Sequence, residues 1–199
     1  MADGQRLIIG ISGASGAIYG VRLLQSLKPL AIESHLVLSR SARMTLTEEL
    51  GMTVSEVQGL ADAYYGAEDM GAVISSGSFR TLGMIVAPCS VRSLSEIAHG
   101  VTSTLLTRAA DVVLKERRRL VLMLRETPLH AGHIRSMLAV TEAGAIVAPP
   151  VPAFYNNPRS LDQMVDHTLG RVLDLFGIEN DLAGRWPGMA SRRDNSVKD

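Results

Sequence analysis

Short apolar runs alternate with longer segments of helical spacing along most of this chain, and this alternation limits the fold more than any other feature. Continuous apolar runs of this length are typical of strands that are buried on both faces of a parallel sheet. The runs are Leu7–Ile11, Ser34–Leu38, Met84–Ala87, Leu120–Leu124 and Ala145–Ala148.

The segments between and after these runs carry apolar residues at helical spacing. Strand, helix, strand units with right-handed crossovers predict an α/β fold with a three-layer, doubly wound parallel sheet. We expect a single domain over residues 1–189 and a polar C-terminal tail over residues 190–199, because 199 residues fit one domain and no linker divides them. The expected helices are Ala17–Leu27, Ala42–Leu50, Val54–Ala63, Leu94–His99, Leu105–Arg117, Gly132–Ala143 and Leu161–Phe176.

Composition argues against several classes of function. Lys and Arg number 20, as do Asp and Glu, so no overall charge attracts nucleic acid or a membrane. The single cysteine, Cys89, excludes an internal disulfide framework and fits a reducing compartment. The N-terminal apolar run is too short and too interrupted for a signal peptide or a membrane span. We therefore expect a cytoplasmic protein.

Residues that directly follow the strands are the candidates for function, because ligands of a doubly wound sheet bind beyond the carboxyl ends of its strands. Ser12-Gly13-Ala14-Ser15-Gly16 follows the first run and opens a helix. Small residues let the backbone approach an anion, and free amides at the helix start point toward it. This stretch predicts a phosphate site at Gly13–Gly16, although a tight turn that binds nothing explains the same residues.

Pro88-Cys89-Ser90-Val91-Arg92-Ser93 repeats this arrangement after the third run. Ser90 and Ser93 are suited to donate to a phosphate, or simply to cap a helix. No histidine stands near Cys89 in the sequence, so a packed thiol is favoured over a nucleophile.

Charged residues suggest a second anion site. Arg125-Glu126 ends the strand Leu120–Leu124 at the functional edge, where an arginine beside a carboxylate suits phosphate clamping with proton transfer. A structural ion pair is the alternative. Arg108 and Lys115 lie two helical turns apart on one helix face, where they also fit a solvated stripe.

A stiff, proline-rich loop from Pro149 to Pro158 presents Phe154 and Tyr155 with little entropy left to lose. Such a loop suits the wall of a pocket or a contact between subunits. His130 and His133 stand at i and i+3, but a third ligand and an H-E-x-x-H pattern are missing. No pair of Asp-rich motifs would hold magnesium against a diphosphate. We expect no metal site.

Taken together, these segments resemble the UbiX/Pad family of flavin prenyltransferases over roughly residues 6–188. Arg119 stands where the family pattern has a proline. The matching stretches are Gly10 to Ala17, Ile74-Ser75-Ser76-Gly77-Ser78-Phe79, Pro88-Cys89-Ser90, Arg108 to Arg117, Arg125-Glu126-Thr127-Pro128-Leu129, Pro152-Ala153-Phe154-Tyr155 and Arg185-Trp186.

The resemblance implies a Rossmann-like sheet, non-covalently bound FMN, and transfer of a dimethylallyl group from dimethylallyl monophosphate to reduced FMN. It implies a prenylated flavin that is used by a UbiD-type decarboxylase, and a homododecamer with active sites at subunit junctions. The FMN contacts that it implies are Gly13, Ala14, Ser15, Gly16, Ser39, Ser90, Ser93 and Arg125. The implied contacts of the prenyl phosphate are Arg108, Lys115, Glu126, Tyr155, Arg171 and Trp186.

The resemblance also implies catalytic roles. Glu126 is our candidate for the acid, Lys115 supplies positive charge to the leaving phosphate, and Ser15 and Glu49 are candidates for moving protons.

Two other functions compete with this interpretation. A flavin-dependent cysteine decarboxylase shares the architecture, but it would need a catalytic histidine after the first helix and an Asn-x-x-Met motif. His35 lies in the second run, and Asn156-Asn157-Pro158 has no methionine. The second competing function is a non-catalytic FMN carrier. Such a carrier would need no second phosphate site, so the second anion site suggested above argues against it.

Overall fold

The computed structural model describes residues 5–184. The chain divides into two compact units, the first ending at Pro150 and the second beginning at Val151. The expected boundary between residues 1–189 and the tail 190–199 lies outside the described residues, and the single domain stays a prediction.

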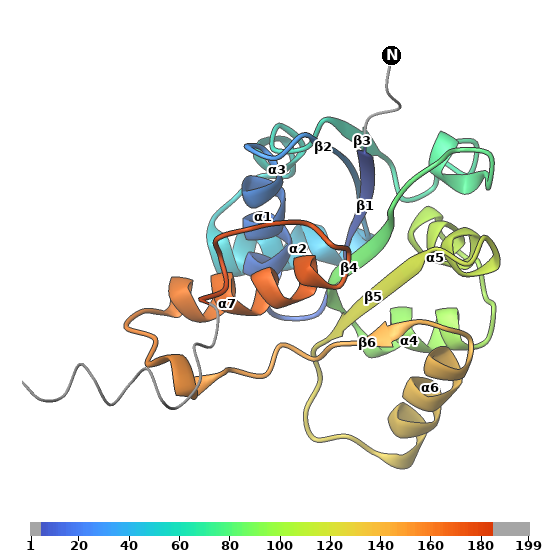
Figure 1. Cartoon of the computed structure of the whole chain (residues 1–199). Helices are drawn as coiled ribbons and strands as arrows, with labels where there is room; N and C mark the ends of the chain where they lie inside the picture. Colours follow the sequence, from blue (N-terminus) through green and yellow to red (C-terminus); the bar gives the residue numbers. More distant parts are fainter. Residues whose placement is uncertain (1–4, 185–199) are drawn as a thin grey trace, which may run out of the picture. The chain divides into compact units, whose positions relative to one another are not determined.

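A six-stranded, wholly parallel sheet forms the centre of the first unit, in the order β3-β2-β1-β4-β5-β6 (Figure 1). Five of these strands coincide with the predicted apolar runs. Four of the five, β1, β2, β4 and β5, are largely buried, whereas β6 is partly buried. The strands are β1 (Gln5–Ile11), β2 (Ile32–Leu38), β3 (Ala63–Tyr65), β4 (Gly83–Cys89), β5 (Arg119–Leu124) and β6 (Ile146–Val147).

Helices cover both faces of the sheet, which confirms the three-layer, doubly wound fold (Figure 1). One face carries α1 (Ala17–Leu27) and α2 (Arg40–Leu50), and the other carries α4 (Val91–Ala98), α5 (Leu105–Lys115) and α6 (Ala131–Glu142). The first unit also holds α3 (Val54–Gln58) and the 3₁₀ turn η1 (Val73–Ser75).

The prediction of one helix over Val54–Ala63 is wrong. Helix α3 ends at Gln58, where Gly59 caps it, and Ala63 begins the edge strand β3. Strand β3 was not predicted because it is three residues long and only partly buried.

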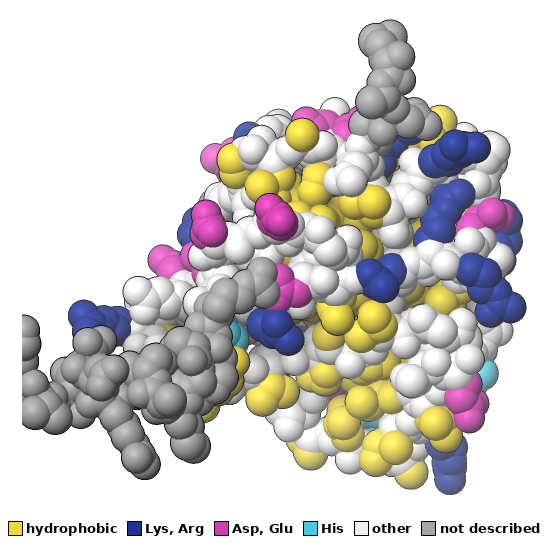
Figure 2. All heavy atoms as spheres, viewed as in Figure 1, with side chains coloured by type: hydrophobic (Ala, Val, Ile, Leu, Met, Phe, Trp, Pro, Cys, Tyr) yellow, Lys and Arg dark blue, Asp and Glu magenta, His cyan; other side chains and the backbone are white. Residues whose placement is uncertain are grey.

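Large hydrophobic side chains also reach the surface of the first unit around α6. Leu129, Ile134 and Leu138 are 41%, 56% and 58% exposed. Figure 2 shows hydrophobic side chains on this part of the unit, near β6 and α6. Scattered apolar side chains are common at protein surfaces, whereas a group of this kind suits contact with another molecule.

The second unit contains the 3₁₀ turn η2 (Phe154–Asn156) and helix α7 (Leu161–Asp174). Ser160 caps α7, its hydroxyl oxygen accepting from the Gln163 amide at 3.2 Å. Within residues 5–184, no helix is both long enough and apolar enough to cross a membrane.

Candidate active site

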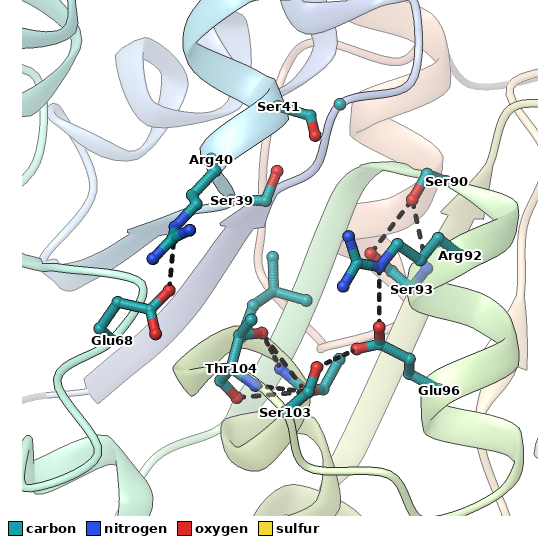
Figure 3. Close-up of a pocket in the computed structure, with 13 residues that line it drawn as sticks. Ser39, Arg40, Ser41, Glu68, Ser90, Arg92, Ser93, Glu96, Ser103 and Thr104 are labelled. Atoms are coloured by element: carbon teal, nitrogen blue, oxygen red, sulfur yellow. Dashed lines mark hydrogen bonds and ion pairs between the residues drawn. The ribbon is translucent and has the colours of Figure 1, made fainter.

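The strand order places a crevice between the carboxyl ends of β1 and β4. From β1 the chain builds outward through β2 and β3 on one side, and through β4, β5 and β6 on the other. In open α/β sheets, ligands bind where the order reverses in this way. A cavity of about 390 Å³ lies there (Figure 3).

The walls of this crevice are rich in hydroxyl groups. Its lining combines hydroxyls from three helix starts with Gly13 from the loop after β1 and with two arginines, Arg40 and Arg92, that pair with Glu68 and Glu96. Four of the predicted FMN contacts therefore meet here: Gly13, Ser39, Ser90 and Ser93. The sequence did not single out the others, which include Arg40, Ser41, Arg92, Thr104 and Thr107.

Buried Ser12 joins the two loops at the centre of the crevice. Its hydroxyl donates to the Pro88 carbonyl oxygen at 2.7 Å and accepts from the Ser90 amide at 2.8 Å. A hydroxyl inside an apolar interior needs such partners, and here they fix the loop after β1 against the start of α4. Ser12 is a positioning residue that sequence reasoning missed. A serine directly after an apolar strand was the available signal.

Ser39 and Ser90 hold their places by capping helices. The Ser39 oxygen accepts from the Ala42 amide at 3.2 Å. The Ser90 oxygen accepts from the Ser93 amide at 3.2 Å, and its hydroxyl donates to the Ser93 oxygen at 3.2 Å. The alternative that Ser90 caps a helix is therefore correct, Ser39 is a cap that was not predicted, and both residues also line the crevice.

Gly13 allows the loop after β1 to approach α2 closely. A Cβ atom at this position would lie 2.2 Å from the Cβ of Ser41. Side chains of any size are therefore excluded, and the backbone itself forms this wall of the crevice.

Glu49, at the end of α2, supplies the cap that helix α1 lacks. Gly16 begins α1 with a φ of 98° and no side-chain cap of its own. One carboxylate oxygen of Glu49 accepts from the amides of Gly16 and Ala17, both at 2.9 Å. Of the Gly13–Gly16 stretch that was predicted to hold a phosphate, the Gly16 amide therefore already binds a carboxylate.

The surroundings of Glu49 favour its charged form. Burial raises its pKa, but hydrogen bonds from the Ser15 side chain and from the Ala17 and Gly16 amides, together with the Arg125 guanidinium, bring the pKa below its ordinary value. The structure thus brings together Ser15, Glu49 and Arg125, which lie far apart in the sequence.

Arg125 and Glu126 follow β5 at the same edge of the sheet. The Arg125 amide donates to the Cys89 carbonyl oxygen at 3.0 Å, which ties this segment to the end of β4. Both side chains are exposed, and a Glu126 carboxylate oxygen accepts from the Thr127 amide at 3.0 Å.

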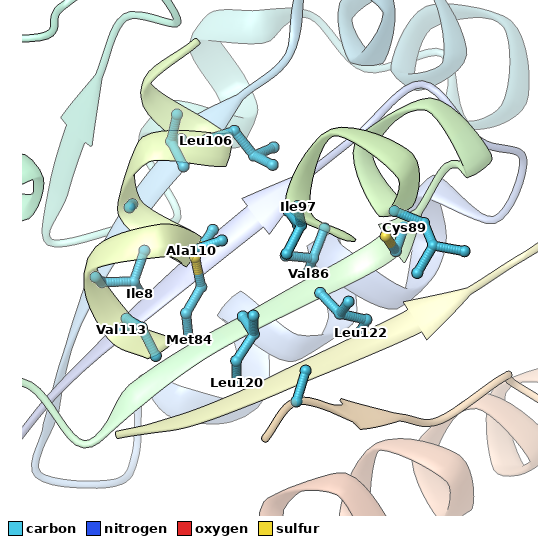
Figure 4. Close-up of a cluster of buried hydrophobic side chains, with 14 of the residues drawn as sticks. Ile8, Met84, Val86, Cys89, Ile97, Leu106, Ala110, Val113, Leu120 and Leu122 are labelled. Atoms are coloured by element: carbon cyan, nitrogen blue, oxygen red, sulfur yellow. The ribbon is translucent and has the colours of Figure 1, made fainter. Parts of the chain in front are cut away.

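Cys89 is a packed thiol, as the sequence indicated. Its side chain is fully buried, and Figure 4 shows it in the apolar cluster that includes Val86, Ile97 and Leu122. Burial raises the pKa of the thiol to about 12. The thiolate that nucleophilic catalysis requires is therefore scarce at neutral pH.

The two basic residues of α5 lie at different ends of the first unit. Thr107 lines the crevice, and α5 then runs away from it, so that Lys115 lies about 10 Å farther along the helix axis than Arg108. Arg118 donates to the carbonyl oxygens of Phe79 and Gly77, which places the end of α5 beside the loop that leads into β4. Lys115 therefore lies toward the amino edge of the sheet.

Both residues have acidic neighbours. Arg108 pairs with Asp111 at 2.8 Å, and Lys115 pairs with Glu116. Within the first unit, the structure does not bring Lys115 to Glu126.

Tyr155 and Arg171 belong to the second unit. The Tyr155 hydroxyl lies 3.5 Å from Nε2 of His167, and their rings meet edge to face. Arg171 pairs with Asp174 at 2.8 Å on α7. Trp186 lies outside the described residues.

Metal-ligating side chains do not gather in the part of the chain that the structure describes. Among residues 5–184, no group of three or more His, Cys, Asp or Glu side chains is arranged to hold a metal ion. Metal-independent chemistry stays a prediction.

Comparison with known proteins identifies the family. The model of the Flavoprotein family matches residues 1–172. The flavin prenyltransferase UbiX of Escherichia coli strain K12 is 59% identical over 187 residues, which cover 92% of this chain and 99% of that protein. The chain belongs to the UbiX family of flavin prenyltransferases. The resemblance in the motifs is thereby confirmed, and the chain is an enzyme of the prenyltransferase class.

Solved UbiX structures share the whole fold. AnUbiX (PadA1), determined in complex with FMN and dimethylallyl pyrophosphate, has a TM-score of 0.91 and 47% identity, covering 93% of this chain and 98% of its own. A dodecameric, FMN-dependent UbiX-like decarboxylase from E. coli O157:H7 has a TM-score of 0.90 and 49% identity, covering 92% and 100%. The peptidyl-cysteine decarboxylase EpiD is 16% identical with a TM-score of 0.64, a likeness of fold alone.

Proposed function

We propose that this chain transfers a dimethylallyl group from dimethylallyl monophosphate to reduced FMN, and that a UbiD-type decarboxylase uses the prenylated FMN. Membership of the UbiX family supports the reaction class. AnUbiX was solved with FMN and dimethylallyl pyrophosphate, which supports FMN and a dimethylallyl donor, and the choice of the monophosphate rests on the family resemblance. We place the reaction in the cytoplasm, a reducing compartment that suits the single thiol of Cys89.

The crevice between β1 and β4 fits FMN. Its hydroxyl groups suit a phosphate and a polyol chain, and the guanidinium groups of Arg40 and Arg92, each paired with a glutamate, lie on the same walls. Bound reduced FMN supplies the electron-rich ring that accepts the prenyl group. The contacts that we propose are those predicted from the sequence, from Gly13 to Gly16 and at Ser39, Ser90, Ser93 and Arg125.

The position of Glu49 decides which of these proposed contacts hold the FMN phosphate. Its carboxylate takes the amides of Gly16 and Ala17, so a phosphate at the same amides would meet a like charge. We therefore place the phosphate beside the hydroxyls of Ser39, Ser90 and Ser93, which leaves Ser15 and Glu49 for the flavin ring.

Ser15 and Glu49 are suited to take up a proton. The lowered pKa keeps Glu49 a carboxylate at neutral pH, a weak base that can relay a proton but not retain it, and its hydrogen bond with Ser15 offers the path. Glu126, at the end of β5, is our candidate for the acid. It would donate to the phosphate oxygen as the bond from that oxygen to the allylic carbon breaks and its electron pair leaves with the phosphate.

The remaining prenyl-phosphate contacts are proposed to come from Arg108, Lys115, Tyr155, Arg171 and Trp186. Within the first unit, Lys115 lies away from the carboxyl edge, so we propose that subunits meet to complete the site. A homododecamer is consistent with the dodecameric E. coli relative. The exposed side chains of Leu129, Ile134 and Leu138 are available for burial in such an assembly.

The observation that carries the proposal is the hydroxyl-lined crevice at the reversal of strand order, to which Gly13 belongs; the same loop after β1 brings Ser15 to Glu49. The test is anaerobic incubation of the protein with reduced FMN and either dimethylallyl monophosphate or dimethylallyl diphosphate. The product is followed by mass spectrometry, and its filtrate is added to a cofactor-free UbiD-type decarboxylase.

We expect FMN enlarged by one C₅H₈ unit from the monophosphate, and activation of the decarboxylase by the filtrate. Product from the diphosphate alone would overturn the choice of donor. Bound FMN without any product would instead favour the carrier function.

A further inference from the structure

A second cavity, of about 620 Å³, lies between α4 and α6 in the first unit. Its lining includes the basic side chains Arg92, His99, His130, His133 and Arg135. No Asp or Glu is found among the described residues that line this cavity. Apart from Arg92, which also lines the crevice between β1 and β4, none of its lining residues enters the proposed prenyl transfer.

Hydrogen bonds around the histidines indicate which ring nitrogens carry protons. Nδ1 of His130 accepts from the Gly132 amide at 2.9 Å, which leaves the proton of a neutral ring on Nε2. Nδ1 of His133 is buried without a partner, and a buried N–H group without an acceptor is costly, so its proton also belongs on Nε2. Both rings, whose centroids lie 3.6 Å apart with the planes tilted by 31°, therefore offer N–H donors.

The two arginines add positive charge to these donors. Arg92 is partly neutralised, since its Nε lies 2.8 Å from a Glu96 carboxylate oxygen, and the other oxygen of Glu96 accepts from Ser103. Arg135 is exposed and has no ion-pair partner among residues 5–184. The cavity thus carries net positive charge and N–H donors.

We propose that this cavity binds a small organic anion, in which a phosphate or carboxylate group is attached to a ring or a short apolar body. Guanidinium forks match the geometry of both anionic groups. The volume exceeds what one phosphate needs, and Val91, Leu94 and Ala139 provide an apolar wall for the body of the ligand.

The test is calorimetric titration of the FMN-loaded protein with phenyl phosphate and, separately, with benzoate. Benzyl alcohol serves as the neutral probe of similar shape. We expect at least one of the anions to bind at one site per chain while FMN remains bound, and we expect benzyl alcohol not to bind. The anion that binds more tightly identifies the anionic group.

Two variants and a control separate the contribution of positive charge to anion binding from that of the apolar wall. Arg135→Gln should weaken anion binding about tenfold, the loss typical of one hydrogen bond to a charged group. Ala139→Met keeps the charge but fills the apolar wall, so it should weaken phenyl phosphate more than inorganic phosphate. Arg80→Gln removes another exposed arginine of the first unit and should leave binding unchanged.

Several results would overturn the proposal. These are failure of both anions to bind, equal binding of benzyl alcohol, equal weakening by Arg80→Gln, or loss of the binding site when FMN saturates the protein. The last result would assign the anion to the crevice between β1 and β4.

Discussion

Replacing Gly13 by alanine tests whether the close approach of the loop after β1 to α2 shapes the crevice. The added Cβ would lie 2.2 Å from the Cβ of Ser41, and 3.1 and 3.3 Å from its carbonyl carbon and Cα. Carbon atoms pack best at about 3.5–4.0 Å, so the loop and α2 must separate by about 1.5 Å. The φ of Gly13 lies outside the left-handed region, so the penalty is steric.

Overpacking of this kind typically costs about 1–3 kcal/mol. For a chain of this length, each kcal/mol lowers Tm by about 2–4 °C, so Gly13→Ala should lower Tm by about 2–12 °C. FMN affinity should fall about tenfold or more, the loss expected when one hydrogen bond to a charged group is broken. Thermal unfolding and fluorescence titration with FMN measure the two effects.

A companion substitution and a control isolate the cause. Ser41→Gly removes the atom at 2.2 Å, so the double variant Gly13→Ala/Ser41→Gly should recover most of the stability and affinity. Gly66→Ala adds a Cβ with no atom within 4 Å and should change neither property. Wild-type stability and FMN affinity in Gly13→Ala, or a double variant no better than the single one, would refute the steric argument.

Three further predictions follow from individual residues. Glu126→Gln should keep FMN bound while prenyl transfer slows by about 10²–10⁴-fold, the usual contribution of a general acid, and near-normal turnover would remove Glu126 from that role. If Lys115 and Arg171 neutralise the prenyl phosphate in place of a metal ion, transfer should survive EDTA yet fall sharply in Lys115→Ala or Arg171→Ala, whereas loss of transfer in EDTA and its recovery with magnesium would contradict this role. Burial lowers the pKa of His35, with Glu33 opposing and Arg6 adding to the shift, so the unfolded chain binds a proton at higher pH than the folded chain does. Stability should therefore be full above the ordinary histidine pKa and fall below it, and the drop in urea midpoint between about pH 7.5 and 5.5 should shrink in His35→Gln; an equal drop would argue against His35.

The fold was predictable because a strand that is buried on both faces appears in the sequence as a continuous apolar run. Helix α1 has the predicted bounds Ala17–Leu27, and the predicted run Leu120–Leu124 lies inside β5. The edge strand β3 was missed because its three partly buried residues do not form such a run.

The site was predictable only where parallel strands impose proximity. Gly13, Ser39 and Ser90 follow strands that end at one edge, so their meeting follows from topology. The contact of Glu49 with the start of α1 joins the far end of α2 to a distant loop, and no spacing in the sequence indicates it. Only the family resemblance pointed to Glu49.

The most direct test of the central claim, that the crevice between β1 and β4 holds the flavin, is a crystal structure of this protein with FMN. We predict FMN density in the crevice, with its phosphate beside Ser39, Ser90 and Ser93 and its ring toward Ser15 and Glu49. FMN bound elsewhere, or a phosphate that displaces Glu49 from the amides of Gly16 and Ala17, would contradict this placement.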